Sequence, residues 1–226
     1  MNFSIIIPTL DESSKIEHCL LALQPLRPES EIIIVDGGSK DNTVELSQAL
    51  ADKVITSTKG RARQMNAGAQ QATGKMLVFL HADTLLPDNA LDLINQAGNN
   101  WGRFDIKLLG KPFMLKVVAS FMNWRSRLTG IATGDQVIFI SKQLFDKVGG
   151  YPDIALMEDI SLCSTLKKIS APSCLKAKVE SSGRRWEEFG VFKTILLMWS
   201  IRLRYFFGEK PEVLAKLYSR GLFWKP

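Results

Sequence analysis

Short, unbroken apolar runs alternate with longer amphipathic segments through the first hundred residues. Three of these runs stop abruptly at polar residues, within 5–12, 32–39 and 76–84. A continuous apolar run of this length is typical of a strand that is buried on both faces of a parallel sheet. Residues 16–23 instead carry apolar side chains at helical spacing. Strands that alternate with helices of this size predict βαβ units with right-handed crossovers.

The same pattern predicts where most of the elements lie. Strands are predicted at 3–7, 31–35, 54–56, 75–80, 101–109 and 135–140. Helices are predicted around 16–23, at 43–51, from Arg61 to Gly74, after Pro87, and at 112–128, 142–148, 158–169, 191–207 and 211–219. The first half is therefore regular and the second half less so.

Composition is typical of a soluble globular protein. The 226 residues are 46% apolar and 23% charged, and a chain of this length can bury a large core. We see no internal repeat, low-complexity tract or linker, and we therefore expect one domain over residues 1–226. Cys19, Cys163 and Cys174 form no Cys-x-x-Cys pair, and the chain has two histidines, which argues against a structural zinc site. Buried thiols in a reducing cytoplasm are expected.

Charge and hydropathy limit the partners and the location. The net charge is +6, but Lys and Arg are spread along the chain, without the aromatic-interleaved basic tract of a nucleic-acid-binding protein. Concentrated anions, such as a nucleotide diphosphate or a lipid surface, are better candidate partners. The N-terminus lacks the pattern of a signal peptide, and no uncharged stretch approaches the ~20 residues that a membrane-spanning helix needs. We therefore expect a cytoplasmic or peripheral protein that binds no nucleic acid.

Polar residues at the strand ends mark a candidate site, because ligands bind beyond the carboxyl ends of the strands in an open α/β sheet. Asp36 precedes Gly37 and Gly38, and it is either a turn former or a carboxylate that accepts a hydrogen bond from a base or ribose. Asp83 ends a strand of unbroken hydrophobicity, and a hard divalent cation would be a suitable partner for its charge. His81 points to the same side. The alternative is that Asp83 caps the following loop and His81 packs in the core.

Three further clusters carry candidate residues, each with a structural alternative. Arg61 and Arg63 follow Gly60 at the start of a predicted helix, where cations oppose the helix dipole and an anion such as a diphosphate would neutralise them. An ordinary basic surface is the alternative. Residues 184–186, Arg-Arg-Trp, suit holding a phosphate or stacking on a ring, or form a surface salt-bridge cluster. The acids at 158–159 begin a helix, where the dipole favours them in any case.

Together these motifs resemble those of the family 2 glycosyltransferases, which have the GT-A (nucleotide-diphospho-sugar transferase) fold. The motifs occur in the family's order: Ile-Pro-Thr at 7–9, Val-Asp-Gly-Gly-Ser at 35–39, the Arg-Asn-Gly helix at 61–68, Phe-Leu-His-Ala-Asp at 79–83, Gly-Gly-Tyr at 149–151, Glu-Asp at 158–159 and Arg-Trp at 185–186. The chain looks most like a small, single-domain bacterial branch that shares the run Gly-Arg-Ala-Arg-Gln-Met-Asn-Ala-Gly-Ala. The resemblance implies an α/β fold, a Rossmann-like and mainly parallel sheet flanked by helices. Residues 1–100 would form the nucleotide-binding half, and residues 101–226 the acceptor-side half with its C-terminal helices.

The resemblance also implies roles for individual residues. Asp159 matches the catalytic base, and Asp83 matches the metal-binding second acid of the family's Asp-x-Asp motif. Asp36 would bind the base, usually uracil. The other residues of the implied nucleotide-sugar site are Pro8, Thr9, Glu12, Gly38, Arg61, Arg63, Asn66, His81, Ala82, Arg185 and Trp186. His81 stands where the family has its first acid, and Ser182 where it has glutamine.

The implied reaction is a direct displacement, with inversion, at the anomeric carbon of a nucleotide-diphosphate sugar, usually a UDP-sugar. Asp159 would deprotonate the acceptor hydroxyl, and Mg²⁺ or Mn²⁺ on Asp83 would stabilise the departing nucleoside diphosphate. The acceptor is open: a small molecule, a glycan or a lipid-linked molecule. One alternative is a catalytically silent nucleotide-binding protein on the same fold. Another is a sugar-nucleotide pyrophosphorylase, which should have a Gly-rich loop where this chain has residues 8–11, Pro-Thr-Leu-Asp. A nicotinamide-dependent oxidoreductase is disfavoured because no Gly-x-Gly-x-x-Gly follows the first strand.

The segment 189–207 bears on where the protein works. Apolar and aromatic side chains recur in it every three or four residues: Phe192, Ile195, Leu196, Trp199, Leu203 and Phe206. Lys193, Arg202 and Arg204 flank them. A helix that packs this face on the core is the favoured interpretation. The alternative is a helix that lies in the headgroup plane of a membrane, with weak peripheral contact at its inner face.

Overall fold

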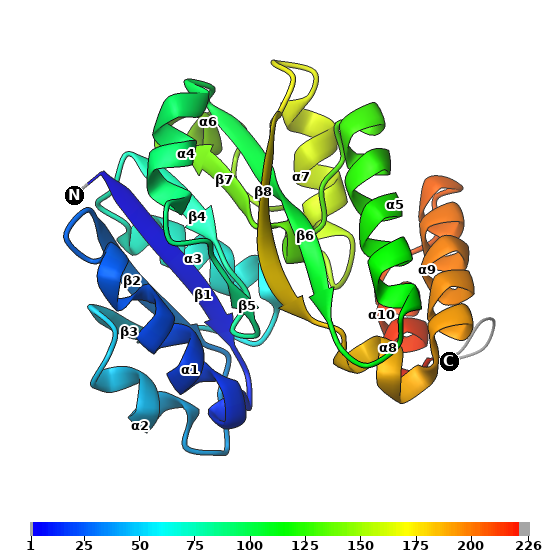
Figure 1. Cartoon of the computed structure of the whole chain (residues 1–226), viewed down its shortest axis with the longest axis horizontal. Helices are drawn as coiled ribbons and strands as arrows, with labels where there is room; N and C mark the ends of the chain where they lie inside the picture. Colours follow the sequence, from blue (N-terminus) through cyan, green and yellow to red (C-terminus); the bar gives the residue numbers. More distant parts are fainter. Residues whose placement is uncertain (1, 222–226) are drawn as a thin grey trace.

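A curled sheet of eight strands runs through the computed structural model, which describes residues 2–221 (Figure 1). The strands lie side by side in the order β3 (Lys53–Thr56), β2 (Ser30–Asp36), β1 (Phe3–Thr9), β4 (Met76–Phe79), β7 (Ile138–Ser141), β6 (Trp101–Leu109), β8 (Ser173–Ser182) and β5 (Thr84–Leu85). The sheet therefore contains strands from both the predicted nucleotide-binding half and the predicted acceptor-side half.

The first four strands in this order are parallel, as the apolar runs predict. β1 pairs with β2 so that Thr9 lies opposite Asp36, and β4 lies on the other side of β1. β7 is antiparallel to both β4 and β6, whereas β6 and β8 are parallel. The side chains of β1 and β2 are almost entirely buried, because helices cover both faces. The carboxyl ends of β1, β2 and β4 thus meet at one edge of the sheet.

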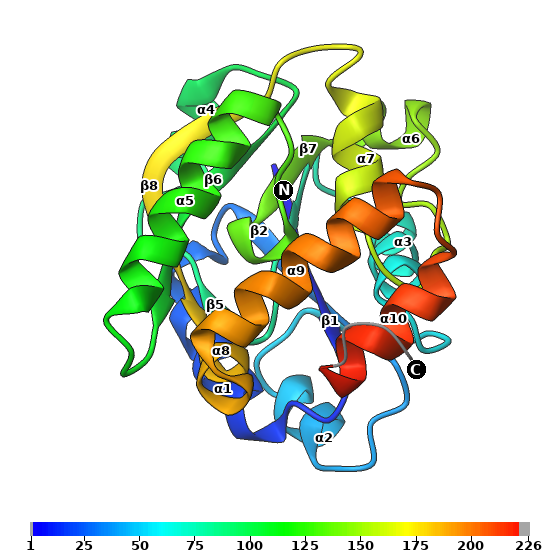
Figure 2. The same ribbon diagram turned by 90° about the vertical axis from the view of Figure 1, so that its right-hand side faces the viewer.

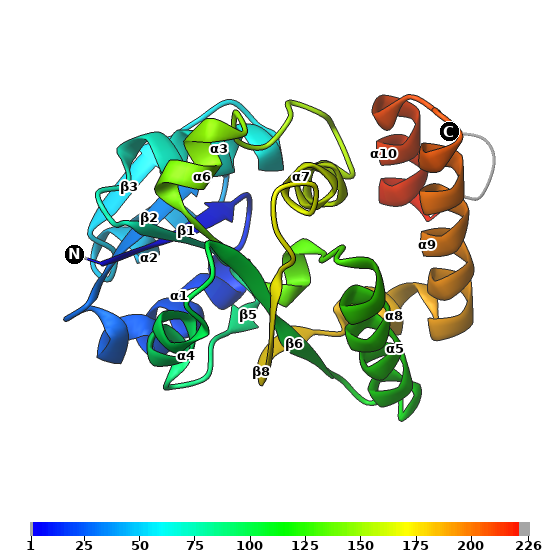
Figure 3. The same ribbon diagram turned by 90° about the horizontal axis from the view of Figure 1, so that it is seen from above.

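Helices cover the two faces and extend the second half of the chain. One face carries α1 (Ser13–Leu23), α4 (Ala90–Ala97) and α5 (Met114–Thr129), with α2 (Thr43–Gln48) packed beside α1. The other face carries α3 (Arg61–Gln71), α6 (Lys142–Lys147) and α7 (Glu158–Leu166). Two 3₁₀ turns occupy Gln24–Leu26 and Gly134–Gln136. The layers are visible in Figure 3, where α3 and α6 lie on the opposite side of the sheet from α1 and α4.

Three helices at the C-terminal end form a separate layer: α8 (Arg184–Phe189), α9 (Val191–Phe206) and α10 (Pro211–Arg220). α9 and α10 pack together through a small cluster that contains Leu197, Ile201, Leu214 and Leu217. Met157, just before α7, joins the same cluster and connects this layer to the rest of the molecule. No helix within residues 2–221 has the length and apolar character that crossing a bilayer requires.

The predicted elements differ from the structure in a few places. β8, which forms ten residues of the sheet, is missing from the prediction, as is the short β5. The predicted strand at 135–140 begins later, at Ile138, because Gly134–Gln136 forms a 3₁₀ turn with a capping box between Thr133 and Gln136. The helix predicted after Pro87 starts at Ala90.

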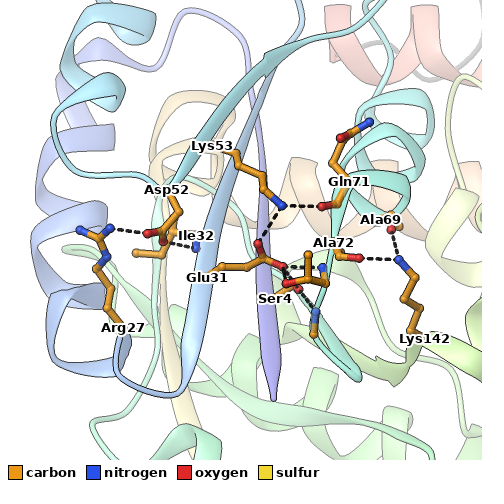
Figure 4. A network of polar contacts seen from close by, with 12 residues as sticks. Ser4, Arg27, Glu31, Ile32, Asp52, Lys53, Ala69, Gln71, Ala72 and Lys142 are labelled. Carbon is orange, nitrogen blue, oxygen red and sulfur yellow. Dashed lines mark hydrogen bonds and ion pairs between the residues drawn. The ribbon is translucent and has the colours of Figure 1, made fainter. Parts of the chain in front are cut away.

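A polar network fixes the amino edge of the sheet, opposite the candidate site (Figure 4). Glu31 in β2 is 4% exposed, and its carboxylate accepts hydrogen bonds from Ser4 in β1 and from the backbone and side chain of Thr73. Lys53 lies 2.9 Å from the other carboxylate oxygen. Burial opposes ionisation, but these donors prevail and lower the pKa of Glu31 to about 2.

Candidate active site

Hydrogen bonds connect the carboxyl ends of β1 and β2 at the candidate site. Asp36 is 3% exposed, and one of its carboxylate oxygens accepts the backbone N–H groups of Gly38 at 2.8 Å and Ser39 at 2.9 Å. The hydroxyl of Thr9 lies 3.4 Å from the other oxygen. Gly38 has φ of +94°, a conformation that glycine adopts without strain. Asp36 is thus both a turn former and a carboxylate at the strand end, so the two interpretations of the sequence are compatible.

Gln64 on α3 is a site residue that the sequence interpretation missed. Its side-chain amide is buried and donates to the carbonyl oxygens of Thr9 and Val35, both at 2.8 Å. It therefore holds the ends of β1 and β2 together and closes the space beneath Gly37. Its place one turn after Arg61, within the dense motif of residues 59–69, is the signal that could have identified it.

Glu12, His81 and Asp83 come together beyond β1 and β4. Lys15 on α1 lies 3.3 Å from the Asp83 carboxylate, whose side chain is 24% exposed. The Oε2 atom of Glu12 is buried and has no hydrogen-bond partner within residues 2–221. Burial raises the pKa of Glu12, the charges of Lys15 and Arg184 oppose this, and the charge of Asp83 adds to it. The carboxylates of Glu12 and Asp83 can therefore still accept a further hydrogen bond or bind a metal ion.

His81 connects this cluster to the acceptor-side half. Its Nδ1 lies 3.2 Å from Asp135, which belongs to the 3₁₀ turn before β7. A Cβ on Gly134 would lie 2.6 Å from the His81 ring, so the turn can approach the ring this closely because residue 134 is glycine. The side chain of Asp135 is 48% exposed. Burial opposes ionisation there, but the hydrogen bond from His81 and the charge of Arg61 lower the pKa of Asp135.

Asp159, the predicted base, is held by the same turn. Its Oδ2 accepts the backbone N–H of Gly134 at 2.9 Å, and its Oδ1 accepts that of Ile160 at 2.7 Å. Each carboxylate oxygen keeps a further lone pair that can accept a substrate hydroxyl. The hydrogen bond from the Gly134 N–H connects Asp159 to the 3₁₀ turn. The contact between His81 and Asp135 connects the same turn to the segment that follows β4. Asp159 and Asp83 therefore belong to one continuous group of contacting segments.

Glu158, next to Asp159, is buried and faces Arg61 at the start of α3. It is 2% exposed, and its Oε1 lies 3.4 Å from the Arg61 guanidinium. Burial raises the pKa of Glu158, and the adjacent Asp159 adds to this while Arg61 opposes it. Burial is the largest single effect on Arg61 and acts to lower the pKa of its guanidinium. The combined charges of Glu158 and neighbouring groups such as Asp135 and Asp159 exceed this effect, so the pKa is raised. Arg61 is therefore a fixed cation beside the predicted base.

Two residues next to the acids of the acceptor-side half have strained backbone conformations. Met157 precedes Glu158 with φ of +72°, and Val137 follows the 3₁₀ turn with φ of +52°. Such φ values are uncommon for non-glycine residues and are unfavourable for a β-branched side chain. Strain of this kind persists where the surroundings fix the conformation, and it concentrates at functional sites. Both loops therefore hold their carboxylates in defined positions.

Four other predicted site residues lie where the fold uses them. Asn66 donates to the Tyr151 carbonyl at 2.8 Å and accepts the Tyr151 N–H at 2.9 Å, so it anchors the Gly-Gly-Tyr loop. Arg63 points to the surface and pairs with Asp153. Pro8 is half-buried in β1, and Ala82 is a buried core residue.

The predicted Arg-Trp motif packs against the C-terminal helix layer. The Arg185 guanidinium donates to the Tyr218 carbonyl and lies 3.6 Å from the centre of the Tyr218 ring. Trp186 is half-buried and packs on the core cluster beside α5. The Ser182 hydroxyl accepts the Arg184 N–H and so caps the turn into α8. In this arrangement the motif connects β8 to α10.

The residues at the end of β4 fit a divalent cation that is shared with a diphosphate. Asp83 offers a partly exposed carboxylate, and the neighbouring Glu12 has an orphaned buried oxygen. Within residues 2–221 no group of three or more His, Cys, Asp or Glu residues could hold a metal ion by itself. Mg²⁺ is commonly bound by one or two carboxylates together with substrate phosphates, and Asp83 and Glu12 offer two such carboxylates.

Similar structures identify the fold as GT-A. One is the 1–349 fragment of S. aureus TarS in complex with UDP-GlcNAc, with a TM-score of 0.64 and 18% identity, covering 90% of this chain and 67% of that chain. Another is the mannosyltransferase PcManGT of Pyrobaculum calidifontis in complex with GDP-Man and Mn²⁺, with a TM-score of 0.62 and 20% identity, covering 100% of this chain and 66% of that chain.

Sequence comparison gives the family. Residues 4–100 match the family described as Glycosyl transferase family 2. The chain is also 31% identical over 238 residues to the poly-beta-1,6-N-acetyl-D-glucosamine synthase of Staphylococcus epidermidis, an alignment that covers 96% of this chain and 56% of that protein. The chain belongs to the family 2 glycosyltransferases. It spans about a quarter to just over half of the length of the curated relatives it matches.

Proposed function

We propose that the chain transfers a sugar from a nucleotide-diphosphate donor, a UDP-sugar, to a hydroxyl acceptor with inversion at the anomeric carbon. The observation that carries this proposal is the continuous group from Asp83 to Asp159. His81, two residues before Asp83, contacts Asp135, and the N–H of the adjacent Gly134 is bonded to Asp159. The predicted leaving-group side and the predicted base are therefore neighbours.

The donor half of the proposal rests on the edge formed by β1, β2 and β4. Asp36 and Thr9 would receive the nucleoside, and Glu12 and Asp83 would face its diphosphate. A UDP donor agrees with the TarS complex, whereas the PcManGT complex contains GDP-Man. Asp83, with Glu12 beside it, would hold Mg²⁺ or Mn²⁺, which would offset the negative charge that develops on the departing diphosphate. Lys15 would keep Asp83 neutralised before the donor binds.

The acceptor half rests on Asp159. Its carboxylate is oriented by two backbone N–H groups, and it would take the proton of the acceptor hydroxyl as that oxygen attacks the anomeric carbon. Glu158 would fix the Arg61 guanidinium, whose positive charge would face the diphosphate side of the reacting centre. The reaction needs no covalent nucleophile from the protein, because a single displacement with inversion transfers the sugar directly.

The test has two stages that separate binding from chemistry. First, UDP with Mn²⁺ is expected to raise the melting temperature of the protein, because a ligand that binds the folded state alone stabilises it. Second, a panel of nucleotide sugars is screened for metal-dependent hydrolysis or transfer. A protein that binds UDP but turns over no donor would instead be the silent nucleotide-binding protein. Production of nucleotide sugar from sugar phosphate and nucleoside triphosphate would identify a pyrophosphorylase.

We also propose a weak contact with an anionic lipid surface through the exposed faces of α5 and α9. These helices lie side by side in Figures 1 and 2. Their large exposed apolar residues are Phe121, Trp124 and Leu128 on α5 and Phe192, Leu196, Trp199, Leu203 and Phe206 on α9, with exposures of 58–82%. Cations accompany them, since Lys116 lies 5.7 Å from the exposed Phe113 ring. Exposed aromatic residues beside lysines favour an anionic headgroup layer over a neutral one.

A further inference from the structure

An open pocket of about 710 Å³ lies among α5, α7, α9 and the connection from α9 to α10. In Figure 2, α9 crosses this face of the molecule with α5 on one side and α10 on the other. Arg125 on α5 and Arg202 on α9 both line the pocket, together with Ile160 and Ser164 on α7. The donor residues and the predicted base lie outside this lining, so the proposed reaction leaves the pocket unassigned.

Two of the three nitrogen atoms of the Arg125 guanidinium are buried without a partner among the described residues. Its Nε and Nη2 atoms are closed off from solvent and have no hydrogen-bond acceptor within residues 2–221. Burial, with the like charge of Arg202, lowers the pKa of Arg125 to about 10. Burial also lowers the pKa of Arg202. A partly desolvated cation without an ion-pair partner is unfavourable, so two such cations near each other favour the binding of an anion.

Several other arginines of the chain form ion pairs with carboxylates. Arginines that pair with a carboxylate within 4 Å are Arg27, Arg61, Arg63, Arg103, Arg127 and Arg204. Arg127, two residues after Arg125 on the same helix, reaches Asp105. Among ion pairs between the described residues, neither Arg125 nor Arg202 takes part. Unlike Arg127 on the same helix, the two pocket arginines therefore have no carboxylate within 4 Å among the described residues.

The pocket adjoins the predicted base. Ile160, which lines it, directly follows Asp159, and the charge of Asp159 acts on both Arg125 and Arg202. Asp159 itself is held by backbone N–H groups and forms no ion pair with either arginine within residues 2–221. A molecule with its hydroxyl at Asp159 would thus extend its next group toward the two guanidiniums.

We propose that Arg125 and Arg202 bind a phosphate group of the acceptor, next to the hydroxyl that Asp159 activates. This inference rests on the proposed transferase function and names its acceptor class. A guanidinium presents planar pairs of N–H donors that match phosphate oxygens, and two of them supply enough positive charge for a phosphate dianion. The pocket also includes Phe206, which is 82% exposed and continues the apolar row of α9. Its mouth thus opens beside the surface proposed to contact lipid.

Binding of phosphate tests the inference without knowledge of the whole acceptor. Inorganic phosphate and glycerol phosphate are titrated into the full chain, and affinity is measured by calorimetry and by the shift in melting temperature. We expect saturable binding that Arg125→Gln and Arg202→Gln each weaken by ~10-fold or more, since each removes charge-assisted hydrogen bonds. Arg220→Gln, which removes an exposed arginine at the far end of α10, is the matched control and should bind as the unaltered protein does.

Two further measurements make the outcome decisive. UDP affinity in the presence of Mn²⁺ should be the same in all three variants, so a loss of nucleotide binding in Arg125→Gln or Arg202→Gln would assign the pocket to the donor and overturn the inference. Without phosphate, the melting temperature of Arg125→Gln should equal or exceed that of the unaltered protein, because an unpaired buried charge has been removed. A clear fall would instead give Arg125 a structural role.

The source of the phosphate is decided by a comparison of vesicles with soluble ligand. Vesicles that contain phosphatidic acid present a phosphomonoester at a membrane, whereas glycerol phosphate presents it in solution. Arginine-dependent binding of the vesicles, with little affinity for glycerol phosphate, indicates a lipid-linked acceptor, and the reverse result indicates a soluble phosphorylated acceptor. Failure of both, in a protein that still binds UDP with Mn²⁺, rejects the phosphate pocket and leaves the proposed transferase function intact.

Discussion

At the scale of single residues, Asn66 and Asp83 differ in how their side chains are hydrogen-bonded. The sequence predicts that both contact the nucleotide-sugar donor. Both ends of the Asn66 amide are occupied by the backbone of Tyr151, so the side chain positions a loop. The Asp83 carboxylate has Lys15 as its partner and remains partly exposed. A residue that is already fixed by the fold offers less to a ligand than one with spare acceptor capacity. Asp83 is therefore the better target for a first experiment.

Replacement of Asp83 by alanine is expected to remove the enhancement of nucleotide binding by metal. The partly exposed side chain contributes little to the core, so Asp83→Ala should fold normally, and the increase in UDP affinity that Mn²⁺ gives should fall by ~10-fold or more. Titration calorimetry with and without Mn²⁺ measures this. Asp92→Ala, an exposed acid on α4, is the control for loss of charge. An unaltered Mn²⁺ effect in Asp83→Ala would remove this residue from the metal site.

Replacement of Asp159 by asparagine should separate binding from chemistry. The amide oxygen of Asp159→Asn can still accept the Gly134 N–H, so the contact with the 3₁₀ turn should be kept, whereas the amide nitrogen cannot accept the Ile160 N–H. Because the amide cannot take a proton, transfer should fall by roughly 10²-fold or more while UDP affinity stays nearly constant. Steady-state rates with a donor found in the screen provide the measurement. Full turnover in this variant would transfer the role of base to another group, with Glu158→Gln the next variant to examine.

The motifs could be predicted from the sequence because they follow apolar strands, but the contacts between motifs could not. Nothing in the local pattern around Gly134 shows that its N–H reaches Asp159, 25 residues later, or that its missing Cβ makes room for His81. These contacts depend on how β4 and β7 pair. Likewise, Gln64 and Asn66 look equally polar on one helix, and their partners come from separate parts of the chain.

At the scale of elements, burial on both faces made the strands of the first half predictable. β8 is different, because its exposed lysines alternate with partly buried residues up to Val179 and Ser181. That alternation of period two is the mark of a half-buried strand, and it is weaker than an unbroken apolar run. The strand predicted at 135–140 exists, but its predicted start is wrong for another reason. Asp135 and Gln136 are taken up by a capped turn, and the positive φ of Val137 separates that turn from β7.

The amino edge of the sheet gives a prediction about stability and pH. Glu31 has its pKa lowered from 4.5 to about 2, so its contribution is complete above about pH 5 and is lost as the pH falls toward 2. The full shift corresponds to about 3 kcal/mol, and we expect about 2 kcal/mol because the partner Lys53 is 34% exposed and solvent screens that ion pair. Glu31→Gln should therefore lower the free energy of unfolding by that amount at pH 7.

The pH dependence distinguishes this ionic effect from simple loss of packing. Urea unfolding at pH 7 and pH 3 should show the difference between the unaltered protein and Glu31→Gln shrinking by more than half at the lower pH, because Glu31 is then losing its advantage in the unaltered protein as well. Glu29→Gln, an exposed acid two residues earlier, should have little effect at either pH. A constant difference across this range would show that charge is not the cause.

At the scale of the whole molecule, the orientation of α9 overturns the favoured interpretation of its apolar stripe. The helix buries Thr194, Leu197 and Ile201 against α10 and the core. Of the stripe identified in the sequence, Ile195 packs on the core, whereas the other five members are exposed. Apolar periodicity identifies the helix but cannot tell which of two apolar faces packs inward. That choice is made by α10, whose own apolar face covers the other side of α9.

The exposed faces of α5 and α9 lead to the prediction on location. Partition to anionic phosphatidylglycerol vesicles at low salt is expected, with weaker partition at high salt and to neutral phosphatidylcholine, because lysines next to the aromatic residues supply part of the attraction. Trp199→Ser should lower partition by roughly 30-fold, since insertion of a large aromatic side chain contributes on the order of 2 kcal/mol. Trp199 is 71% exposed, so the variant should fold as the unaltered protein does.

Leu21→Ser, which changes an exposed leucine on α1, controls for general loss of surface hydrophobicity. Sedimentation of the protein with vesicles provides the measurement, and absence of binding to anionic vesicles at low salt would mean that these aromatic rows face something other than lipid.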